Sequence, residues 1–342
     1  MFRIYASTPE NMQLHEIAAH AQRAEAMGFD GLNIPDSIHD GLLLSALALN
    51  ATTKLTVGTG VLVAFPRSPM TVAIAAWDLQ RLSNGRFELG LGTQVKGNIE
   101  NRYSTTWTAP MPRMRDYIGS VRAIFNSFQH GVPLQFESDN YHFTRLQPFF
   151  NPGPLDCIPP PIFIGAVGPL MTALAGEAAD GIITHPTNTP SRYLHEVTLP
   201  RLQQGITKAA RKKEDVRLIL GNIVATGKDD AAVTAEREKQ RKLLGFLYST
   251  PAYWPSLELF GWQDKGEQLL QCTRNNDWHN MAKIIDDEML DTFAPCASYD
   301  TIADVIATRY EAINATINFP VPEHPDDDSA VADVIRQLKS ME

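Results

Sequence analysis

Two histidines are the residues of this chain best suited to move a proton. His185 follows an apolar run in the stretch GIITHPTN, and His39 follows another in GLNIPDSIHD. Imidazole changes its charge near neutral pH, so both side chains are candidates for general acid or base catalysis. A lone histidine at a strand end is at least as often a structural hydrogen-bonding group, and His39 can serve only if its loop turns inward.

Asp36 and Ser37 stand between that second apolar run and His39. From spacing alone, an aspartate at such a position most often caps the following helix. A serine hydroxyl is neutral and is a poor general base near pH 7. The residue types therefore leave Ser37, His39 and His185 as the catalytic candidates.

A glycine-proline turn at Gly165-Ala166-Val167-Gly168-Pro169 has the properties of an anion site. It ends an apolar run and opens a helix, with Pro169 suited to the first helical position. Exposed backbone N–H groups and the helix dipole at such a turn favour a phosphate. A tight turn that holds no ligand is the alternative.

The stretch RFELGLGTQVKGN, residues 86–98, changes from apolar to polar at a Gly-Leu-Gly-Thr turn. Glycines at a strand end bring bare backbone close to a neighbouring group. The polar groups just past such a strand are where α/β barrels usually hold their chemistry. The ligand-binding candidates here are Thr93, Gln94, Lys96 and Asn98.

The composition narrows the class of partner. The 342 residues are 44% hydrophobic and 20% charged, with a formal net charge of −9. A nucleic-acid surface needs a concentrated basic face, so a small-molecule substrate is favoured. The three cysteines have no disulfide or metal-site spacing, and no metal is expected. Without a basic leader or an apolar run of membrane length, we expect a cytoplasmic protein that binds neither membrane nor nucleic acid.

Apolar runs alternate with segments of helical period, which is typical of repeated βα units around a parallel sheet. An open doubly wound sheet normally carries a glycine fingerprint after its first strand, and residues 7–10 contain no glycine. We therefore predict an α/β fold with a single (β/α)8 TIM barrel spanning residues 1–342. The eight expected strands are residues 2–6, 31–35, 55–61, 87–92, 162–166, 181–184, 217–224 and 315–319.

Three further segments are expected around these strands. A first helix is predicted over residues 12–27, with Leu14, Ile17 and Ala21 on its packed face. Residues 129–161, with a short hairpin, and residues 246–289 read as insertions. Insertions in a barrel are expected over its C-terminal mouth, so both are predicted to lie there.

The order of these motifs resembles the bacterial luciferase-like superfamily. The resemblance is carried by LTVGTGVLVAFPRSP, GRFELGLGT, LQPFFNPGPL, PPPIFIGAVGPL and AADGIITHP. Within the superfamily, the chain is most similar to the branch that uses the deazaflavin coenzyme F420. The resemblance covers nearly the whole chain and is weakest over residues 246–289.

The resemblance assigns roles to several residues. It implies a non-prolyl cis peptide at Gly60-Val61 against the coenzyme ring, and a coenzyme-facing carboxylate at Asp36. It implies that Val167, Gly168 and Pro169 hold the coenzyme phosphate, as the turn at Gly165 independently favours. The polar side chains after the fourth strand would contact the ring and tail, and His185 would hydrogen-bond the coenzyme. Basic residues expected near the polyglutamate tail are Arg67, Lys96, Arg102, Arg113 and Arg115.

Two departures from the relatives bear on the reaction. Ser37 stands where alcohol-oxidising relatives carry a histidine base, and Val95 stands where many carry a glutamate. The resemblance therefore implies hydride transfer between F420 and a small organic substrate, with reduction favoured over alcohol oxidation.

Other functions remain open at this point. The alternatives are an FMN-dependent luciferase-like monooxygenase and a catalytically silent flavin-type binding protein. A metal-dependent hydrolase is disfavoured because the first strand ends in Ala6-Ser7-Thr8, without a His-x-His pair. A homodimer is also implied, through alanine-rich surfaces on helix one and on residues 71–82.

Overall fold

The computed structural model describes residues 2–341 and confirms the closed parallel barrel. Its strands follow the order β3-β2-β1-β13-β10-β9-β8-β5-β4, and pairing of β3 with β5 closes the ring. β3 and the short β4 follow one another at one barrel position, so the nine strands fill eight positions. The barrel strands are β1 (Arg3–Ser7), β2 (Gly31–Ile34), β3 (Thr56–Thr59), β4 (Leu62–Val63), β5 (Phe87–Gly92), β8 (Ile162–Gly165), β9 (Gly181–Ile183), β10 (Arg217–Leu220) and β13 (Thr316–Pro320).

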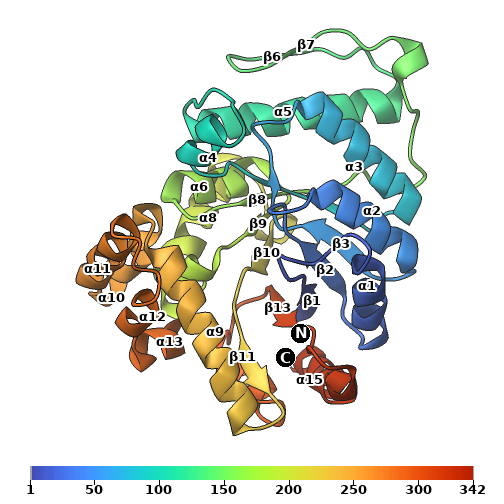
Figure 1. Cartoon of the computed structure of the whole chain (residues 1–342). Coiled ribbons are helices and arrows are strands. Elements are labelled where there is room, and N and C mark those ends of the chain that lie inside the picture. The colour runs from blue at the N-terminus through green and yellow to red at the C-terminus, as the bar shows by residue number, and fades with distance from the viewer. Residues whose placement is uncertain (1, 342) are drawn as a thin grey trace.

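Helices surround the strands and turn an apolar face toward the barrel, although the outer face of α2 also exposes Leu43 and Leu47. In Figure 1, α1 to α3 cover one flank, α5 lies above them, and the C-terminal α15 lies near the N-terminus. No helix within residues 2–341 combines the length and apolar character needed to cross a membrane. The helices outside the large insertion are α1 (Ile17–Ala26), α2 (Gly41–Ala51), α3 (Pro69–Ser83), α4 (Lys96–Asn101), α5 (Pro110–His130), α6 (Pro169–Ala178), α7 (Ser191–Tyr193), α8 (Leu199–Lys208), α14 (Ile302–Arg309) and α15 (Asp328–Ser340).

The first helix is shorter than predicted. It begins at Ile17, because the chain makes two turns beforehand, closed by Met12 N–H to Pro9 O and by Glu16 N–H to Gln13 O. Leu14 therefore lies outside the helix and is 36% exposed, whereas Ala21 is fully buried as expected.

The barrel interior at the end where the strands begin is charged. Tyr5 Oη donates to Glu88 Oε2 at 3.1 Å, and Arg217 Nη2 donates to Glu88 Oε1 at 2.6 Å. The Arg217 guanidinium also lies 4.5 Å from the centre of the Phe163 ring. Burial, reinforced by the Glu88 carboxylate, raises the pKa of Tyr5. Burial opposes the charge of Arg217, but the facing Glu88 outweighs it and raises the pKa of that guanidinium. This end of the barrel is closed by groups that satisfy one another.

The first insertion does not lie over the mouth, which corrects the prediction for residues 129–161. It follows α5 and leads into β8, so it starts at the end of the barrel where strands begin. Its hairpin of β6 (Phe136–Glu137) and β7 (His142–Phe143) forms as expected. Trp77 Nε1 on α3 donates to Gly153 O, and Gln129 Nε2 on α5 donates to Leu155 O. The segment therefore packs outside the barrel, and Figure 1 shows the hairpin beyond α5.

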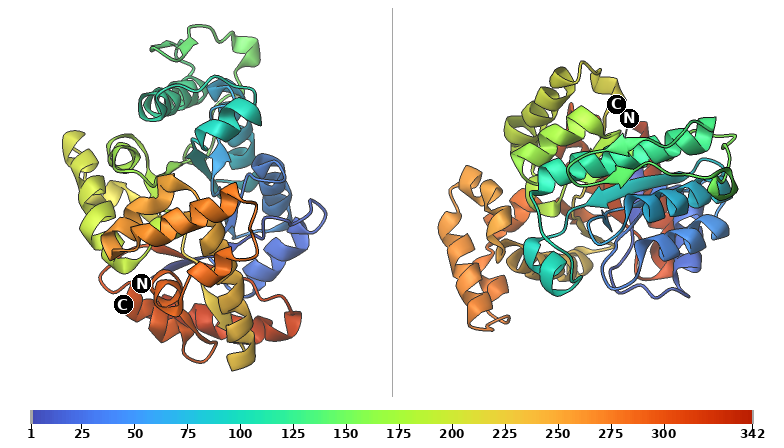
Figure 2. Two further views of the ribbon diagram at one scale, coloured as in Figure 1. Left: turned by 60° about the vertical axis from the view of Figure 1, so that its left-hand side comes forward. Right: turned by 90° about the horizontal axis from the view of Figure 1, so that it is seen from above.

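The second insertion leaves the barrel after β10 and forms a helical subdomain, shown in orange in Figure 2. It enters through β11 (Ala225–Gly227) and leaves through β12 (Cys296–Ser298), which pair in parallel. Its own apolar core includes Leu244, Tyr248 and Phe293. Its helices are α9 (Asp230–Tyr248), α10 (Trp254–Phe260), α11 (Gln263–Arg274), α12 (Met281–Ile284) and α13 (Asp287–Phe293).

Candidate active site

The third strand breaks at the position expected to face a ligand. The Gly60–Val61 peptide bond is cis, as the resemblance implied, and it separates β3 from β4. A Cβ atom added to Gly92 would lie 2.3 Å from Val61 Cγ2, and one added to Gly165 would lie 3.1 Å from Val61 Cγ1. Glycine is needed at these two strand ends so that the Val61 side chain can lie between them.

An apolar floor lies next to Val61. It consists of Phe163, Ile183 and Ile219, three inward-facing residues that form one buried cluster with Val61 packed against it. Such a surface excludes water and suits one face of a flat, apolar ring.

The turn after β8 presents unpaired backbone donors. Gly168 is the N-cap of α6, no side chain caps this helix, and Pro169 is its first residue. Within the described chain, the N–H groups of Val167, Gly168 and Leu170 have no backbone acceptor. A Cβ atom added to Gly168 would meet no atom within 4 Å. The geometry is that of an open helix N-terminus able to accept an anion.

The polar residues after β5 form hydrogen bonds with one another. Gln94, whose φ is +57°, accepts hydrogen bonds at Oε1 from Val95 N–H at 2.9 Å and from Asn98 Nδ2 at 3.1 Å. Thr93 Oγ1 donates to the Gln94 carbonyl at 3.1 Å. Gln94 and Asn98 thus shape the start of α4, and their expected contacts with a coenzyme remain predictions.

His185 is held rigidly at the end of β9. Its Nδ1 lies 2.8 Å from Thr187 Oγ1, and its ring stacks on Tyr253 of the second insertion at 4.4 Å between centroids. Tyr248 Oη, also from the insertion, donates to Thr187 O at 3.2 Å. The second insertion therefore lies beside the mouth, and it is longer than the predicted residues 246–289, because it runs from β11 to β12. Burial lowers the pKa of His185 to about 4, so the imidazole is neutral at pH 7.

The Asp36 carboxylate forms an ion pair with Arg67, which lies in the loop after β4. Its carboxylate accepts from Arg67 Nη1 at 2.8 Å and Nη2 at 3.2 Å, and from Val63 N–H at 2.8 Å. Its other contact is Gly41 N–H at 3.0 Å, although Asp40 is the N-cap of α2. The Asp36 side chain is only 4% exposed. The structure thus gives Asp36 a bracing role, and its expected contact with a coenzyme remains a prediction.

Most of the basic side chains expected near a coenzyme tail also form ion pairs or hydrogen bonds within the protein. Arg115 pairs with Glu177 on α6, Arg102 donates to Ser37 O, and Arg113 donates to Phe65 O and to Tyr141 Oη. Lys96 is different, since its side chain is 65% exposed and its nearest carboxylate oxygen, on Glu100, lies 3.9 Å away.

Ser37 and His39 follow β2 with polar atoms that lack partners. Ser37 Oγ and His39 Nε2 are buried, and neither has a hydrogen-bond partner within residues 2–341. Thr8 Oγ1, just past β1, is in the same state, with Thr8 only 8% exposed. Buried polar groups are normally satisfied, so this side of the mouth has unused hydrogen-bonding capacity.

Three asparagines at the mouth were missed by the sequence reasoning. Asn33 Nδ2 donates to Asn318 Oδ1 at 2.5 Å, while Asn222 exchanges two 2.9 Å bonds with the Asn318 backbone. The available signal was an asparagine inside an apolar strand, in GLNI and TINFP. Strand alternation places both residues on the inward face.

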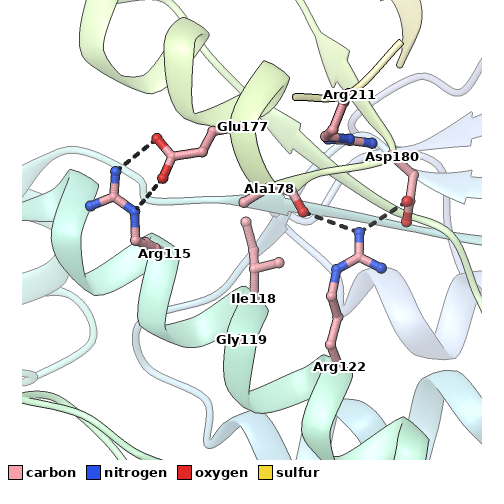
Figure 3. Close-up of a pocket in the computed structure, with 8 residues that line it drawn as sticks. All are labelled: Arg115, Ile118, Gly119, Arg122, Glu177, Ala178, Asp180 and Arg211. Carbon is pink, nitrogen blue, oxygen red and sulfur yellow. Dashed lines mark hydrogen bonds and ion pairs between the residues drawn. The ribbon is translucent and has the colours of Figure 1, made fainter. Parts of the chain in front are cut away.

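The hollow drawn in Figure 3 is a separate feature on the outside of the barrel. Its volume is about 480 Å³, and it lies between α5 and the end of α6. Arg122 pairs with Asp180 at 2.9 Å, and Arg211 donates to Gly176 O and Ala179 O. The Arg122–Asp180 ion pair links α5 to the segment after α6, and Arg211 links the segment after α8 to the end of α6. Within residues 2–341, no group of three His, Cys, Asp or Glu side chains is placed to hold a metal ion.

Comparison with known proteins agrees with this fold. Residues 2–316 match the family of luciferase-like monooxygenases, and the chain belongs to that family. An uncharacterized protein of Mycobacterium tuberculosis is 41% identical over 301 residues, which are 88% of each chain. The 5,10-methylenetetrahydromethanopterin reductase of Archaeoglobus fulgidus is 27% identical, covering 96% of this chain and 97% of the reductase.

A solved structure shows the same fold over the full length. The coenzyme F420-dependent tetrahydromethanopterin reductase of Methanopyrus kandleri superposes with a TM-score of 0.79 at 20% identity, covering 100% of this chain and 99% of that one. The molecule is a luciferase-like oxidoreductase, from a family whose members use F420 or a flavin.

Proposed function

We propose that this protein transfers a hydride between coenzyme F420 and a small organic substrate, and that it favours reduction over alcohol oxidation. The observation that carries the proposal is the uncapped start of α6 at Gly168, next to the apolar surface around Val61. Relatives named as F420-dependent or methanopterin reductases, similar over nearly the whole chain, support the choice of coenzyme.

The residues at the mouth fit such a coenzyme in two places. The free N–H groups of Val167, Gly168 and Leu170 would hold a phosphate, because the helix dipole adds to their hydrogen bonds. Val61, lying over Gly92 and Gly165, would support one face of the ring. When bound, the deazaflavin supplies or accepts the hydride, and the protein orients it and excludes water.

The residues at the mouth support reduction over alcohol oxidation. Alcohol oxidation needs a base to take the hydroxyl proton as hydride leaves. His185 is very weakly basic, with a pKa of about 4, and Asp36 is occupied by Arg67, which leaves His39 as the remaining candidate base. Reduction of an activated alkene or imine needs only a held geometry and one proton, delivered to the atom next to the new C–H bond. His39 or water would supply that proton, because the neutral imidazole of His185 is a poor acid at pH 7.

Two other functions use the same mouth. An FMN-dependent monooxygenase is supported by the family description, and a silent binding protein by Ser37 at the position of the relatives' histidine. The first would consume oxygen with reduced FMN, and the second would bind a coenzyme without turnover.

Absorbance titration of the purified protein with F420 and with FMN tests the coenzyme. We expect saturable binding of F420 that is tighter than binding of FMN. Anaerobic oxidation of reduced F420 by unsaturated acceptors, set against F420 reduction by secondary alcohols, tests the direction. Tighter FMN binding with oxygen uptake would replace the proposal by the monooxygenase.

Ser37→Ala provides a control for the role of the residue at the histidine position. We expect turnover with unsaturated acceptors to change by less than about threefold, because a neutral hydroxyl contributes little as a base. Efficient oxidation of a secondary alcohol by the wild type, abolished in this variant, would contradict the proposed direction.

A further inference from the structure

The amide groups at the mouth differ in how far they are satisfied. Asn222 uses both ends of its amide, donating to Asn318 O and accepting from Asn318 N–H. Asn33 and Asn318 share one bond, from Asn33 Nδ2 to Asn318 Oδ1. Among the described residues, Asn33 Oδ1 and Asn318 Nδ2 take part in no further hydrogen bond. The Asn33 carbonyl oxygen and the Asn318 NH2 group therefore remain free on two linked side chains.

The strand registers place both side chains inside the barrel. Tyr5, which points inward to Glu88, is in register with Gly31 on one neighbour and with Asn318 on the other. Asn33 lies two residues beyond Gly31, so it faces inward one layer nearer the mouth. Its Oδ1 would lie 3.3 Å from a Cβ atom added to Gly60. The Asn33 amide is therefore beside the peptide bond expected to face the coenzyme.

The two asparagines and the anion-binding turn lie on opposite sides of the barrel. β2 and β13 flank β1, and β1 lies four positions from β8 in the eight-position barrel. A coenzyme with its phosphate at Gly168 enters from the opposite side. The buried and unpartnered Thr8 Oγ1, just past β1, belongs to the same sector as the two amides.

We infer that Asn33 and Asn318 form the substrate subsite, and that it recognises a planar group presenting an N–H beside a C=O, as in a lactam or another cyclic amide. The substrate N–H donates to Asn33 Oδ1, and its carbonyl accepts from Asn318 Nδ2. This inference rests on the proposed function, because it assigns the other side of the mouth to the coenzyme. A purely structural pair would be saturated, as Asn222 is, whereas these side chains keep complementary groups free.

Two small probes test the subsite without turnover. 2-Pyridone carries the N–H and C=O edge, and N-methyl-2-pyridone has a methyl group in place of the donated hydrogen. We expect ligand-detected NMR titration, with and without F420, to show 2-pyridone binding about five- to tenfold more tightly, as one added hydrogen bond allows. Equal binding of the two probes would overturn the inference.

Substitutions at Asn33 and Asn318 test which side chain contacts each part of the probe. Asn33→Ser shortens the side chain and withdraws the free acceptor, so it should abolish the preference for 2-pyridone. Asn318→Asp removes the donor for the carbonyl that both probes share, so it should weaken both probes alike, whereas Asn276→Asp, at an exposed position just past α11, should change neither. Persistence of the preference in Asn33→Ser, or unchanged binding of both probes in Asn318→Asp, would contradict the assignment.

A coenzyme titration of the same variants separates this inference from the proposed function. We expect F420 affinity to change by less than about threefold in Asn318→Asp and Asn33→Ser. If these variants weaken F420 rather than 2-pyridone, the amides face the coenzyme and the substrate assignment is wrong. If wild-type protein binds no F420 but keeps the probe preference, the proposed function fails and the amide-recognising subsite stands.

Discussion

The two ends of the barrel interior are built from polar groups in opposite ways. Where the strands begin, Tyr5, Glu88 and Arg217 pair with one another. At the mouth, glycines expose backbone, α6 starts without a cap, and Asn33 and Asn318 keep hydrogen-bonding groups free. Saturated polar groups stabilise a fold, whereas unsaturated groups on a rigid scaffold are available to a ligand. The difference indicates which end binds.

The largest expected effect comes from breaking the closed end. Arg217→Ala would leave the Glu88 carboxylate, whose side chain is 8% exposed, without its cationic partner. We expect the free energy of unfolding to fall by about 3 kcal/mol, measured by urea denaturation. The double variant Glu88→Gln with Arg217→Met removes both charges and should recover part of the loss. A change below about 0.5 kcal/mol in the single variant would show that the pair does not stabilise this end.

The mouth should respond in ligand binding rather than in stability. Gly168→Asp adds an N-cap to α6 in open space, so we expect unchanged or higher thermal stability. The added carboxylate should repel a phosphate and weaken F420 binding at least tenfold. Gly168→Ala, which leaves the N–H groups free, is the matched control and should bind within about threefold of wild type. Equal affinity in all three proteins would remove the phosphate from this turn.

The free energy of unfolding at acid pH should depend on His185, which lies at the mouth. Burial lowers its pKa from 6.5 to about 4, so between these values the unfolded chain binds a proton that the folded chain does not. The contribution of His185 to stability is therefore fully present above pH 6.5 and declines as the pH falls toward 4. His185→Phe keeps an aromatic ring against Tyr253 and should lose about 1 kcal/mol less than wild type between pH 6.5 and pH 5. Parallel stability curves for the two proteins would contradict a depressed pKa.

The smallest effect on the site is expected from the outer surface, where we propose a homodimer. The alanines first considered for it are buried inside the subunit, as Ala21 and Ala76 show. Leu43 and Leu47 on α2 and Ile74 on α3 are instead 57%, 41% and 42% exposed. Leu47→Glu should shift the mass measured by light scattering from dimer toward monomer with little change in F420 binding. Ile158→Glu, at a residue that is 70% exposed outside these helices, should leave the mass unchanged.

Much of the barrel could be predicted from the sequence because its strands are short apolar runs bounded by turn residues. The strand at residues 87–92 matches β5 at both ends, and the strand predicted over residues 217–224 overlaps β10 but ends later. The late start of α1 depends on local hydrogen bonds that periodicity does not record. The misplaced first insertion has a simpler cause, because it precedes a strand instead of following one.

The site was less predictable because its decisive contacts join residues far apart in the chain. The glycine turn at residues 165–169 carried its own local signal. The Asp36 pair with Arg67 and the Asn33 bond to Asn318 span 31 and 285 positions and have no fixed spacing. A single sequence gives residue types at strand ends, but their partners follow from the order in which the strands close the ring.

The parallel pairing of β11 with β12 brings the two ends of the large insertion together. Ala225 pairs with Cys296, so the chain leaves and returns at adjacent positions, and the helices between have their own core. The length of the segment between these two strands is therefore not set by the hydrogen bonds of the barrel ladder. Tyr248 and Tyr253 carry its contacts with Thr187 and His185, respectively, and Arg309 on α14 donates to its Thr292 carbonyl. Such a joint lets the wall beside the mouth diverge among relatives while the barrel beneath it stays constant.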